Sequence, residues 1–340
     1  MLSPSCRHPM LRSFPSLLCR LLVLALPLGL VACDGAESPL SPAEDPLDPA
    51  TGPAPTEAVA SDPAQVLATS QRIVFISYRD GNGNVYKVNP QGYQVARLTS
   101  SPEDDYAPAW SSDNSRIAMV RPRLDGGVTH ADIWVINADG SDGHWARATP
   151  SPWDLMDPSW SPDGSRLVLS VIIQGTWYLG WMELATGNIY LINPLSGGIV
   201  GTRPSYDRTG QKIIYVGSHY DTVEQINADG SGHKLRYSSK IAVDHPTFSP
   251  DGKRIAFEKG GIPGNTDIFV KNFATGITTR LTSSLAADRN ASWSPDGTRI
   301  AFMSERSGKP QIWTMNAATG GGLARITHTA SYERYPAWSH

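Results

Sequence analysis

The sequence predicts an all-β fold made of six similar units, and three observations support it. A motif that places an aromatic residue before Ser-Pro-Asp-Gly, or a close variant, recurs with anchors at Trp110, Trp160, Tyr206, Phe248, Trp293 and Trp338. These anchors are 50, 46, 42, 45 and 45 residues apart, a period typical of four-stranded propeller blades. A second turn also occurs six times, as NPQG, NADG, LATG, NADG, FATG and AATG. Residues 71–340 are therefore expected to form a six-bladed β-propeller.

Residues 1–32 are typical of a bacterial lipoprotein signal peptide. Three arginines precede the apolar run LLVLALPLGLVA, which is too short to span a bilayer as a mature helix. The run ends in LVAC, which resembles a lipobox, and this resemblance implies that Cys33 is acylated and begins the mature chain. An ordinary secretory signal cleaved nearby is the alternative. Translation from Met10 instead of Met1 would give a more typical signal length.

Residues 33–70 are predicted to be a disordered acidic tether. Residues 34–70 contain seven Pro, eight Ala, seven acidic residues and no Lys or Arg. A segment of this composition cannot bury enough apolar surface to offset its ordering entropy. The remaining cysteines, Cys6 and Cys19, lie within the signal peptide. The mature chain therefore has no internal disulfide and no cysteine-based metal site.

Each unit of residues 71–340 contains four strand-like runs separated by turns. In the last complete unit these are ASWS, RIAFMS, QIWTMN and LARIT, in which β-branched and aromatic residues dominate. Residues 71–99 contain the second, third and fourth runs but lack a first, whereas YPAWSH at the C-terminus is a first run alone. The C-terminal strand is therefore expected to join the N-terminal blade, which closes the ring and leaves no open sheet edges.

The pattern PxWSPDGxxIAFxS…IWxMNxxTG…RIT resembles the Tol-type (TolB-like, WD40-like) β-propeller repeat of bacterial envelope proteins. The resemblance covers residues 71–340. It implies a periplasmic or other extracytoplasmic location and an envelope protein or peptide as partner. TolB proteins carry an α/β domain before the propeller, and here the acidic tether stands in its place.

Other classes of function receive less support from the sequence. A formal net charge of −3 argues against nucleic acid as the partner. No Gly-x-Ser-x-Gly nucleophile elbow is present, and the eight His are scattered, so the sequence favours a protein that is not an enzyme. The membrane is expected to be contacted through the N-terminal lipid only. A carbohydrate-binding module that uses Trp145 and Trp153, or a metal-dependent enzyme, remains the alternative, as does a TolB-like role in envelope integrity.

The candidate ligand or partner face lies just before each first strand, where the chain enters the channel mouth. The Asp in each Ser-Pro-Asp-Gly copy is explained by turn chemistry, so it is not a catalytic candidate. Upstream of the anchors, five of the six units instead carry an acidic residue. The candidates are Asp105, Asp157, Asp244 with His245, Asp288 and Glu333. Converging carboxylates can bind a divalent cation or a basic peptide, although solvated loop acids are the alternative. No resident cofactor is expected otherwise.

Overall fold

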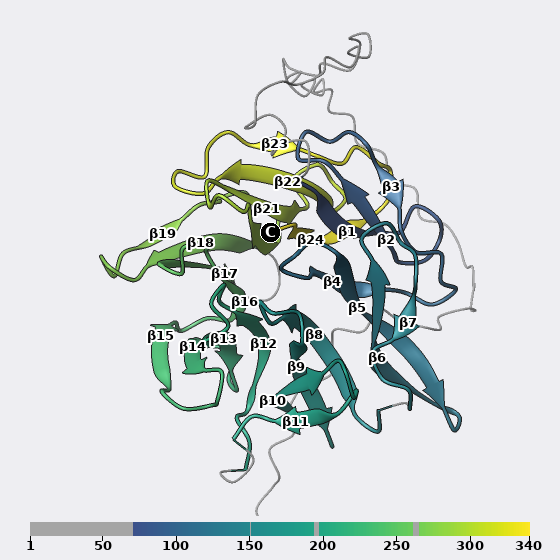
Figure 1. Cartoon of the computed structure of the whole chain (residues 1–340). Coiled ribbons are helices and arrows are strands. Elements are labelled where there is room, and N and C mark those ends of the chain that lie inside the picture. The colour runs from purple at the N-terminus through teal and green to yellow at the C-terminus, as the bar shows by residue number, and fades with distance from the viewer. Residues whose placement is uncertain (1–70, 150, 194–196, 261–264) are drawn as a thin grey trace, which may run out of the picture. The chain divides into compact units, whose positions relative to one another are not determined.

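A computed structural model describes residues 71–149, 151–193, 197–260 and 265–340 (Figure 1). The predicted signal peptide 1–32, the acylation site Cys33 and the tether 33–70 lie outside these residues, so those assignments stay predictions. The described residues contain strands and turns and no helix. Among them, no helix is long and apolar enough to cross a membrane.

The described chain forms 24 strands. Those of the first half are β1 (Ile73–Ser77), β2 (Asn84–Val88), β3 (Ala96–Arg97), β4 (Tyr106–Trp110), β5 (Arg116–Asp125), β6 (Val128–Asn137), β7 (His144–Trp145), β8 (Asp154–Trp160), β9 (Arg166–Ile173), β10 (Thr176–Glu183), β11 (Ile189–Leu191) and β12 (Gly201–Tyr206). Those of the second half are β13 (Lys212–Gly217), β14 (Thr222–Asn227), β15 (Lys234–Ser238), β16 (Val243–Phe248), β17 (Arg254–Gly260), β18 (Thr266–Asn272), β19 (Thr278–Arg280), β20 (Asp288–Trp293), β21 (Arg299–Ser304), β22 (Gln311–Asn316), β23 (Ala324–Arg325) and β24 (Glu333–Trp338).

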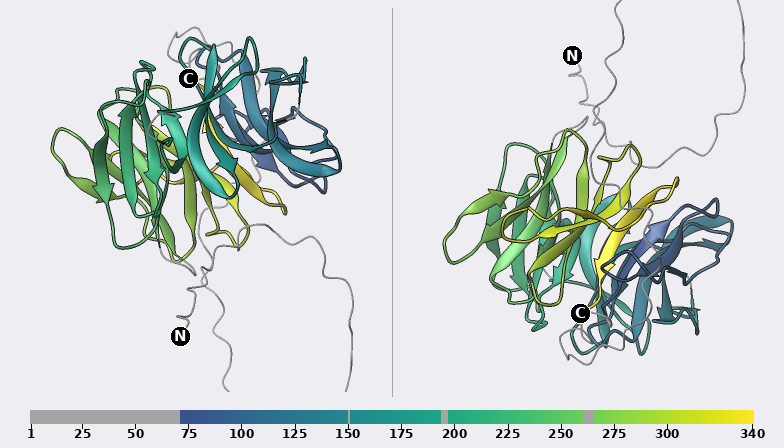
Figure 2. Two further views of the ribbon diagram at one scale, coloured as in Figure 1. Left: turned by 90° about the horizontal axis from the view of Figure 1, so that it is seen from below. Right: turned by 90° about the horizontal axis from the view of Figure 1, so that it is seen from above.

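These strands make six antiparallel sheets of four, which we number as blades 1 to 6 in chain order. Blade 1 has the order β24-β1-β2-β3, and blades 2 to 6 each contain four strands that are consecutive in the chain. The first strand of each blade lies next to the centre of the ring (Figure 1). Figure 2 shows the twisted sheets standing side by side around that centre. The predicted six-bladed propeller is confirmed.

The C-terminal strand closes the ring as predicted. β24 pairs antiparallel with β1, so that Trp338 lies opposite Ile73 and Glu333 opposite Ser77. Beyond the strand, the His340 backbone N–H donates to Asn114 Oδ1 at 2.7 Å, and the Asn114 amide donates back to the His340 carbonyl at 2.6 Å. Asn114 belongs to the first turn of blade 2, so the end of the chain also joins blade 1 to blade 2.

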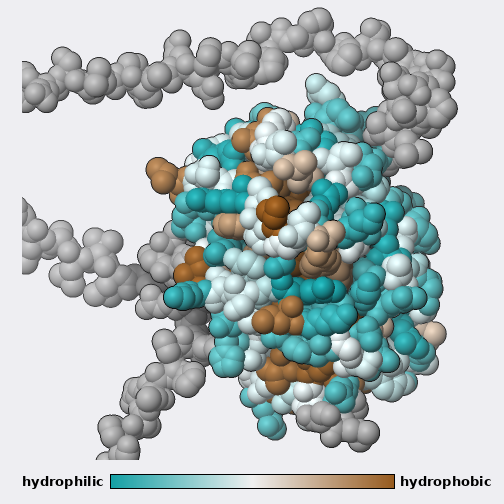
Figure 3. Space-filling model, turned by 90° about the vertical axis from the view of Figure 1, so that its left-hand side faces the viewer, coloured by the Kyte–Doolittle hydropathy of each residue, from teal (hydrophilic) through white to brown (hydrophobic). Residues whose placement is uncertain are grey.

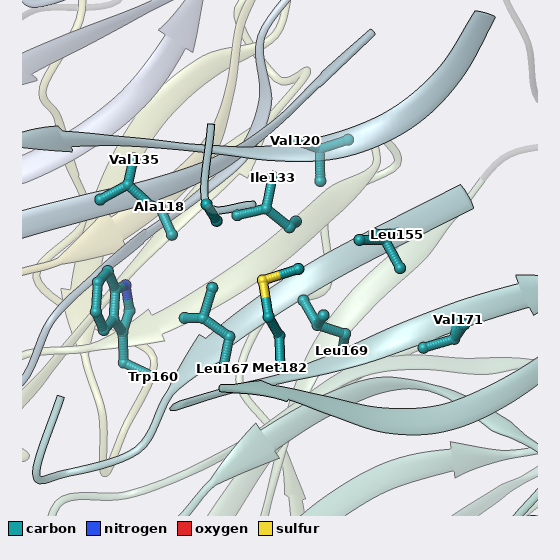
Figure 4. Close-up of a cluster of buried hydrophobic side chains, with 11 residues drawn as sticks. Ala118, Val120, Ile133, Val135, Leu155, Trp160, Leu167, Leu169, Val171 and Met182 are labelled. Atoms are coloured by element: carbon teal, nitrogen blue, oxygen red, sulfur yellow. The ribbon is translucent and has the colours of Figure 1, made fainter. Parts of the chain in front are cut away.

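The core consists of six hydrophobic clusters, and each one lies between two neighbouring blades. Figure 4 shows the cluster between blades 2 and 3, where Val120 and Ile133 face Leu155 and Met182. A blade buries its faces only against its neighbours, so closure of the ring leaves no blade of the described chain with an uncovered apolar face. On the outer side in Figure 3, hydrophobic residues form separate patches within a hydrophilic surface.

The Ser-Pro-Asp-Gly motif forms the turn between the first and second strands. In blade 3 the Asp163 carboxylate accepts hydrogen bonds from Ser161 Oγ at 2.6 Å and from the Ser165 backbone N–H at 3.0 Å. These bonds lower the pKa of Asp163 to about 2. Gly164 has φ of +69°, a conformation that favours glycine. The prediction that this Asp shapes a turn is therefore confirmed.

The aromatic anchor and the basic residue of the motif hold adjacent blades together. Trp160 Nε1 donates to the Ala109 carbonyl of blade 2 at 3.0 Å. The Arg116 guanidinium of blade 2 lies 4.7 Å from the centre of the Trp160 ring and donates to the Gly164 carbonyl at 2.9 Å. Blades 5 and 6 repeat this arrangement with Arg254 and Trp293. The motif is thus a contact between blades as well as a turn.

Candidate functional site

Every first strand contains a β-bulge at the same place. The pairing of the first with the second strand slips in all six blades, for example between Met156 and Ser159 in blade 3 and between Asp244 and Thr247 in blade 5. The residue after the bulged position is proline in five blades, namely Pro108, Pro158, Pro204, Pro246 and Pro336. Proline has no N–H to donate, so it is tolerated where the strand ladder is interrupted.

The residue three places before each anchor occupies the bulge, and we call these six residues the bulge ring. They are Ala107, Asp157, Arg203, His245, Asn290 and Tyr335, with φ between +43° and +56°. A left-handed conformation costs a residue with a Cβ roughly 1–2 kcal/mol. All six blades adopt it, although none has glycine there. A bulge changes the direction in which a side chain points, and here the changed residues meet at the centre.

The bulge ring lines a central cavity of about 250 Å³. The cavity extends along the first strands to the Ser-Pro turns, where Pro162, Arg208 and Pro250 also line it. The six ring residues are all different, whereas three of the turns around the other end of the cavity share the sequence Ser-Pro-Asp-Gly. The ring is therefore the part of the channel whose chemistry is particular to each blade.

Charged residues are concentrated on blades 3, 4 and 5 of the ring. Arg203 Nη1 lies 3.0 Å from Asp157 Oδ1, and Arg203 Nε lies 2.8 Å from Asp244 Oδ1. His245 Nδ1 lies 2.9 Å from Glu258 Oε1 and 3.4 Å from Asp244 Oδ2. Glu258 is 3% exposed, so this network extends from the cavity into the interior of blade 5.

The network shifts the pKa values of its members. Burial alone would raise the pKa of Asp244, but the cations of His245 and Arg203 lower it. Burial alone would lower the pKa of His245, but the carboxylates of Asp244 and Glu258 raise it. Opposite charges therefore outweigh desolvation at both residues. Perturbed groups beside a cavity are a recognised feature of binding and active sites.

The other three predicted acids lie at the start of their strands, two residues before the bulge ring, and are fully buried. Asp105 forms a two-point ion pair with Arg121, at 2.6 and 3.0 Å, and accepts a hydrogen bond from Thr99. Burial raises the pKa of each of the three. Asp288 pairs with Arg306 at 2.8 Å, and Glu333 pairs with Arg79 at 3.2 Å. The three ion pairs tie each first strand to its own blade, and the bond from Thr99 joins blade 2 to blade 1.

Of the six residues singled out in the sequence, only Asp157 and His245 line the cavity. Asp244 lies beside them, and its carboxylate contacts Arg203. The two tryptophans considered for carbohydrate binding are both half-buried. Trp145 makes an edge-on contact with Trp134 at 5.0 Å, and Trp153 packs against the cluster between blades 2 and 3.

Sequence reasoning missed Glu258, Asn290 and Tyr335 as members of the site. Two signals could have found them. The position three before each anchor is chemically different in every unit, which stands out in an otherwise repetitive first run. Glu258 is a charged residue that directly follows RIAF in blade 5, whereas the same four letters in blade 6 are followed by Met303.

Comparisons with known proteins agree with the fold. Residues 223–340 match the family model described as the TolB beta propeller domain. The chain is 35% identical over 105 residues to the Tol-Pal system protein TolB of Alcanivorax borkumensis, an alignment that covers 28% of this chain and 24% of that protein. It is 28% identical over 104 residues to the uncharacterized peptidase YuxL of Bacillus subtilis, which covers 29% of this chain and 16% of that protein. The alignments thus span a quarter or less of the length of these two relatives.

Solved structures of the same fold include a TolB and an oligogalacturonate lyase. The structure of TolB from Acinetobacter baumannii superposes with a TM-score of 0.68 at 20% identity, over 80% of this chain and 67% of that one. An oligogalacturonate lyase in complex with manganese superposes with a TM-score of 0.51 at 16% identity, over 76% of this chain and 74% of the lyase. At these identities the likeness shows the fold alone.

Proposed function

We propose that this chain, which belongs to the TolB-type β-propeller family, is a lipid-anchored scaffold outside the cytoplasm that binds a protein or peptide of the bacterial cell envelope. The propeller supplies a rigid ring, and the bulge ring at its centre supplies the binding chemistry. Acylated Cys33 and the acidic tether keep the ring near a membrane. The scaffold has no catalytic role in this proposal.

One observation carries the proposal. Six structurally equivalent positions line one cavity, and each has a different side chain held in a strained conformation. Strain of this kind persists where the surrounding structure enforces it, and it is concentrated at functional sites. A ring with Asp157, Arg203 and His245 on one side and Asn290 and Tyr335 on the other offers an asymmetric surface. A single asymmetric segment, such as a peptide entering the channel, is the partner that such a ring fits.

Site-specific photocrosslinking in cells tests the binding proposal. A photoreactive amino acid replaces Asn290 in the bulge ring, or Tyr93, which is 63% exposed in a turn of blade 1 away from the ring. We expect a defined protein adduct from position 290 and none of the same mass from position 93. Equal adducts from both positions, or none from position 290, would contradict the proposal.

Replacing Cys33 with Ser tests the anchoring. The expected variant is not acylated and is released from the membrane fraction or retained as an unprocessed precursor. If Cys33→Ser leaves size, processing and membrane association unchanged, the chain is not anchored through this residue.

A metal-dependent enzyme or carbohydrate-binding protein is the second candidate. The observation that favours it is the group formed by Asp244, His245 and Glu258 beside the cavity. A TolB-like part in envelope integrity is compatible with the binding proposal. Recovery of a peptidoglycan-associated lipoprotein as the crosslinked partner would support that role.

A further inference from the structure

Asp244, His245 and Glu258 present three ligand atoms to one point. One oxygen or nitrogen of each lies within 4.8 Å of the other two. Side chains of consecutive residues in a regular strand point to opposite faces. Because His245 occupies the bulge with φ of +43°, its imidazole turns to the side of the Asp244 carboxylate. Glu258 reaches the same point from β17, where it is the cross-strand partner of Asp244.

Glu258 departs from the pattern of the other blades. The residues at its position in the second strands of blades 1, 2, 3, 4 and 6 are Ile76, Val120, Ser170, Val216 and Met303, as the strand registers show. None of these five carries a charge, and all are buried. Burying an ionised carboxylate without a compensating cation costs on the order of several kcal/mol. Among the six blades, blade 5 alone has an acid at this position, and that acid lies beside His245, the only histidine of the bulge ring.

The hydrogen bonds that these three side chains already make still leave one atom of each able to coordinate a metal ion. Asp244 Oδ1 accepts from Arg203 Nε at 2.8 Å and from the His245 backbone N–H at 2.9 Å, so that Oδ2 is the oxygen turned to the imidazole. His245 Nδ1 is enclosed and lies 2.9 Å from Glu258 Oε1. Glu258 Oε1 also accepts from the Asn290 backbone N–H at 2.6 Å, which fixes its position.

The charges around these atoms also fit a divalent cation. Arg203 contacts Asp157 at 3.0 and 3.2 Å and Asp244 at 2.8 Å. The carboxylates of Asp157, Asp244 and Glu258 together therefore carry two more negative charges than this one guanidinium balances. A divalent metal at this point supplies two positive charges and balances both of them.

We propose that Asp244 Oδ2, His245 Nδ1 and Glu258 Oε1 bind a divalent transition metal of the zinc or manganese class. Metal–ligand bonds of about 2.0–2.2 Å in tetrahedral or octahedral geometry place neighbouring ligand atoms about 2.9–3.5 Å apart. The separations of His245 Nδ1 from the two carboxylate oxygens, 2.9 and 3.4 Å, fall in this range. One imidazole with two carboxylates is a donor set suited to these metals. Three protein ligands leave further positions open, and His245 lines the cavity from which a partner group or water can fill them.

Arg203 is a positioning residue in this proposal. It holds Asp244 Oδ1 and thereby orients Oδ2 towards the metal, as hydrogen-bonding neighbours of metal ligands do. The metal site does not depend on the peptide-binding proposal, because its formation is measured without any partner.

Calorimetric titration with manganese chloride and zinc chloride tests the site at neutral pH. The purified protein is first treated with EDTA, and any free cysteine is alkylated so that it cannot bind zinc. We expect one metal per chain and a higher thermal midpoint in the presence of metal. Metal binding should be lost in His245→Ala and in Glu258→Met, which introduces the residue that blade 6 has at this position. Arg203→Met should weaken binding by about 10–100-fold.

A second histidine–carboxylate pair provides the matched control. His233 Nε2 lies 2.9 Å from Glu224 Oε2 on blade 4 but belongs to no three-ligand group in the described residues. His233→Ala should bind metal as the unaltered protein does. The proposal is overturned if the unaltered protein binds no metal, or if His245→Ala and Glu258→Met, shown to be folded by thermal melting, bind it undiminished.

Discussion

Replacing Arg203 with Met should destabilise the propeller substantially, because one cation serves two carboxylates from different blades. Arg203 lies on β12 of blade 4 and contacts Asp157 of blade 3 and Asp244 of blade 5. Methionine keeps much of the aliphatic volume and removes the charge. Asp157 and Asp244, whose side chains are 12% and 30% exposed, would then keep their negative charges without this partner.

The size of the effect follows from these contacts. Hydrogen bonds to charged groups contribute about 1.5–3 kcal/mol each, and breaking a buried ion pair costs about 3–5 kcal/mol. The Arg203 side chain is 25% exposed, so solvent screens part of this interaction. A loss of about 2–4 kcal/mol in the free energy of unfolding is therefore expected at pH 7.

The loss should also depend on pH in a defined direction. The pKa of Asp244 is lowered in the folded protein from its ordinary 3.8, so its contribution is present above that value and disappears as the pH falls through the lowered pKa. The difference between Arg203→Met and the unaltered protein should accordingly shrink below about pH 4. Urea denaturation followed by tryptophan fluorescence at several pH values measures both quantities.

An exposed arginine in the same blade gives the control for this measurement. Arg208→Met makes the same chemical change at an exposed position two residues beyond the anchor Tyr206. It should change stability by less than about 0.5 kcal/mol. A loss below about 1 kcal/mol for Arg203→Met, or an equal loss for both variants, would refute the argument that the network between blades 3, 4 and 5 is stabilising.

Three further outcomes are expected. Trp160→Ala should cost about 3–5 kcal/mol in urea denaturation, because Trp160 is 4% exposed and joins blades 2 and 3; a cost below about 1 kcal/mol would contradict this packing role. Asp163→Asn should lower the free energy of unfolding by about 0.5–1 kcal/mol at neutral pH, a small loss because solvent screens the interactions of this exposed carboxylate. Since the folded pKa of Asp163 is about 2, that cost should vanish as the pH falls from about 4 to about 2, and a pH-independent cost would argue against it. A chain that ends at Tyr332 lacks β24, so its thermal unfolding midpoint should be clearly lower. A synthetic peptide of residues 333–340 should restore this midpoint. If the truncated chain has an unchanged midpoint, ring closure is not stabilising.

The propeller could be predicted from the sequence because its determinants are local and recur. Each turn needs its own Ser-Pro-Asp-Gly chemistry, and each blade needs an aromatic anchor to pack on its neighbour, so the same residues return about every 45 residues. Ring closure could be predicted by counting the strand-like runs at the two ends. The N-terminal unit lacks a first strand, and the C-terminus supplies a first strand that has no blade of its own.

The arrangement of the site could not be predicted in the same way. In the sequence, the acids upstream of the anchors are all assigned to one candidate face. Asp288, Asp244 and Asp157 nevertheless lie at different positions, namely five, four and three residues before their anchors. Because a bulge lies between these positions, a shift of two residues separates a fully buried acid such as Asp288 from a residue of the cavity wall such as Asp157. Nothing in the local sequence indicates positive φ at Arg203, His245 or Tyr335, because this conformation is enforced by the pairing of the strands. Glu258 reaches the site from a different strand, and only the register reveals it.

The distribution of strain among the blades bears directly on where function lies. Every blade holds a residue with a Cβ in the left-handed region, at a general cost of roughly 1–2 kcal/mol each, although glycine would adopt this conformation without that cost. The turns of the same blades do use glycine at positive φ, as at Gly164, Gly210, Gly252 and Gly297. Four of the first turns thus use glycine at positive φ and that of blade 2 uses Asn114, whereas all six bulges carry a side chain that lines the channel. Since those six side chains also differ from one another, the centre of the ring, rather than the repeated turns, is the part of the surface that can distinguish one partner from another.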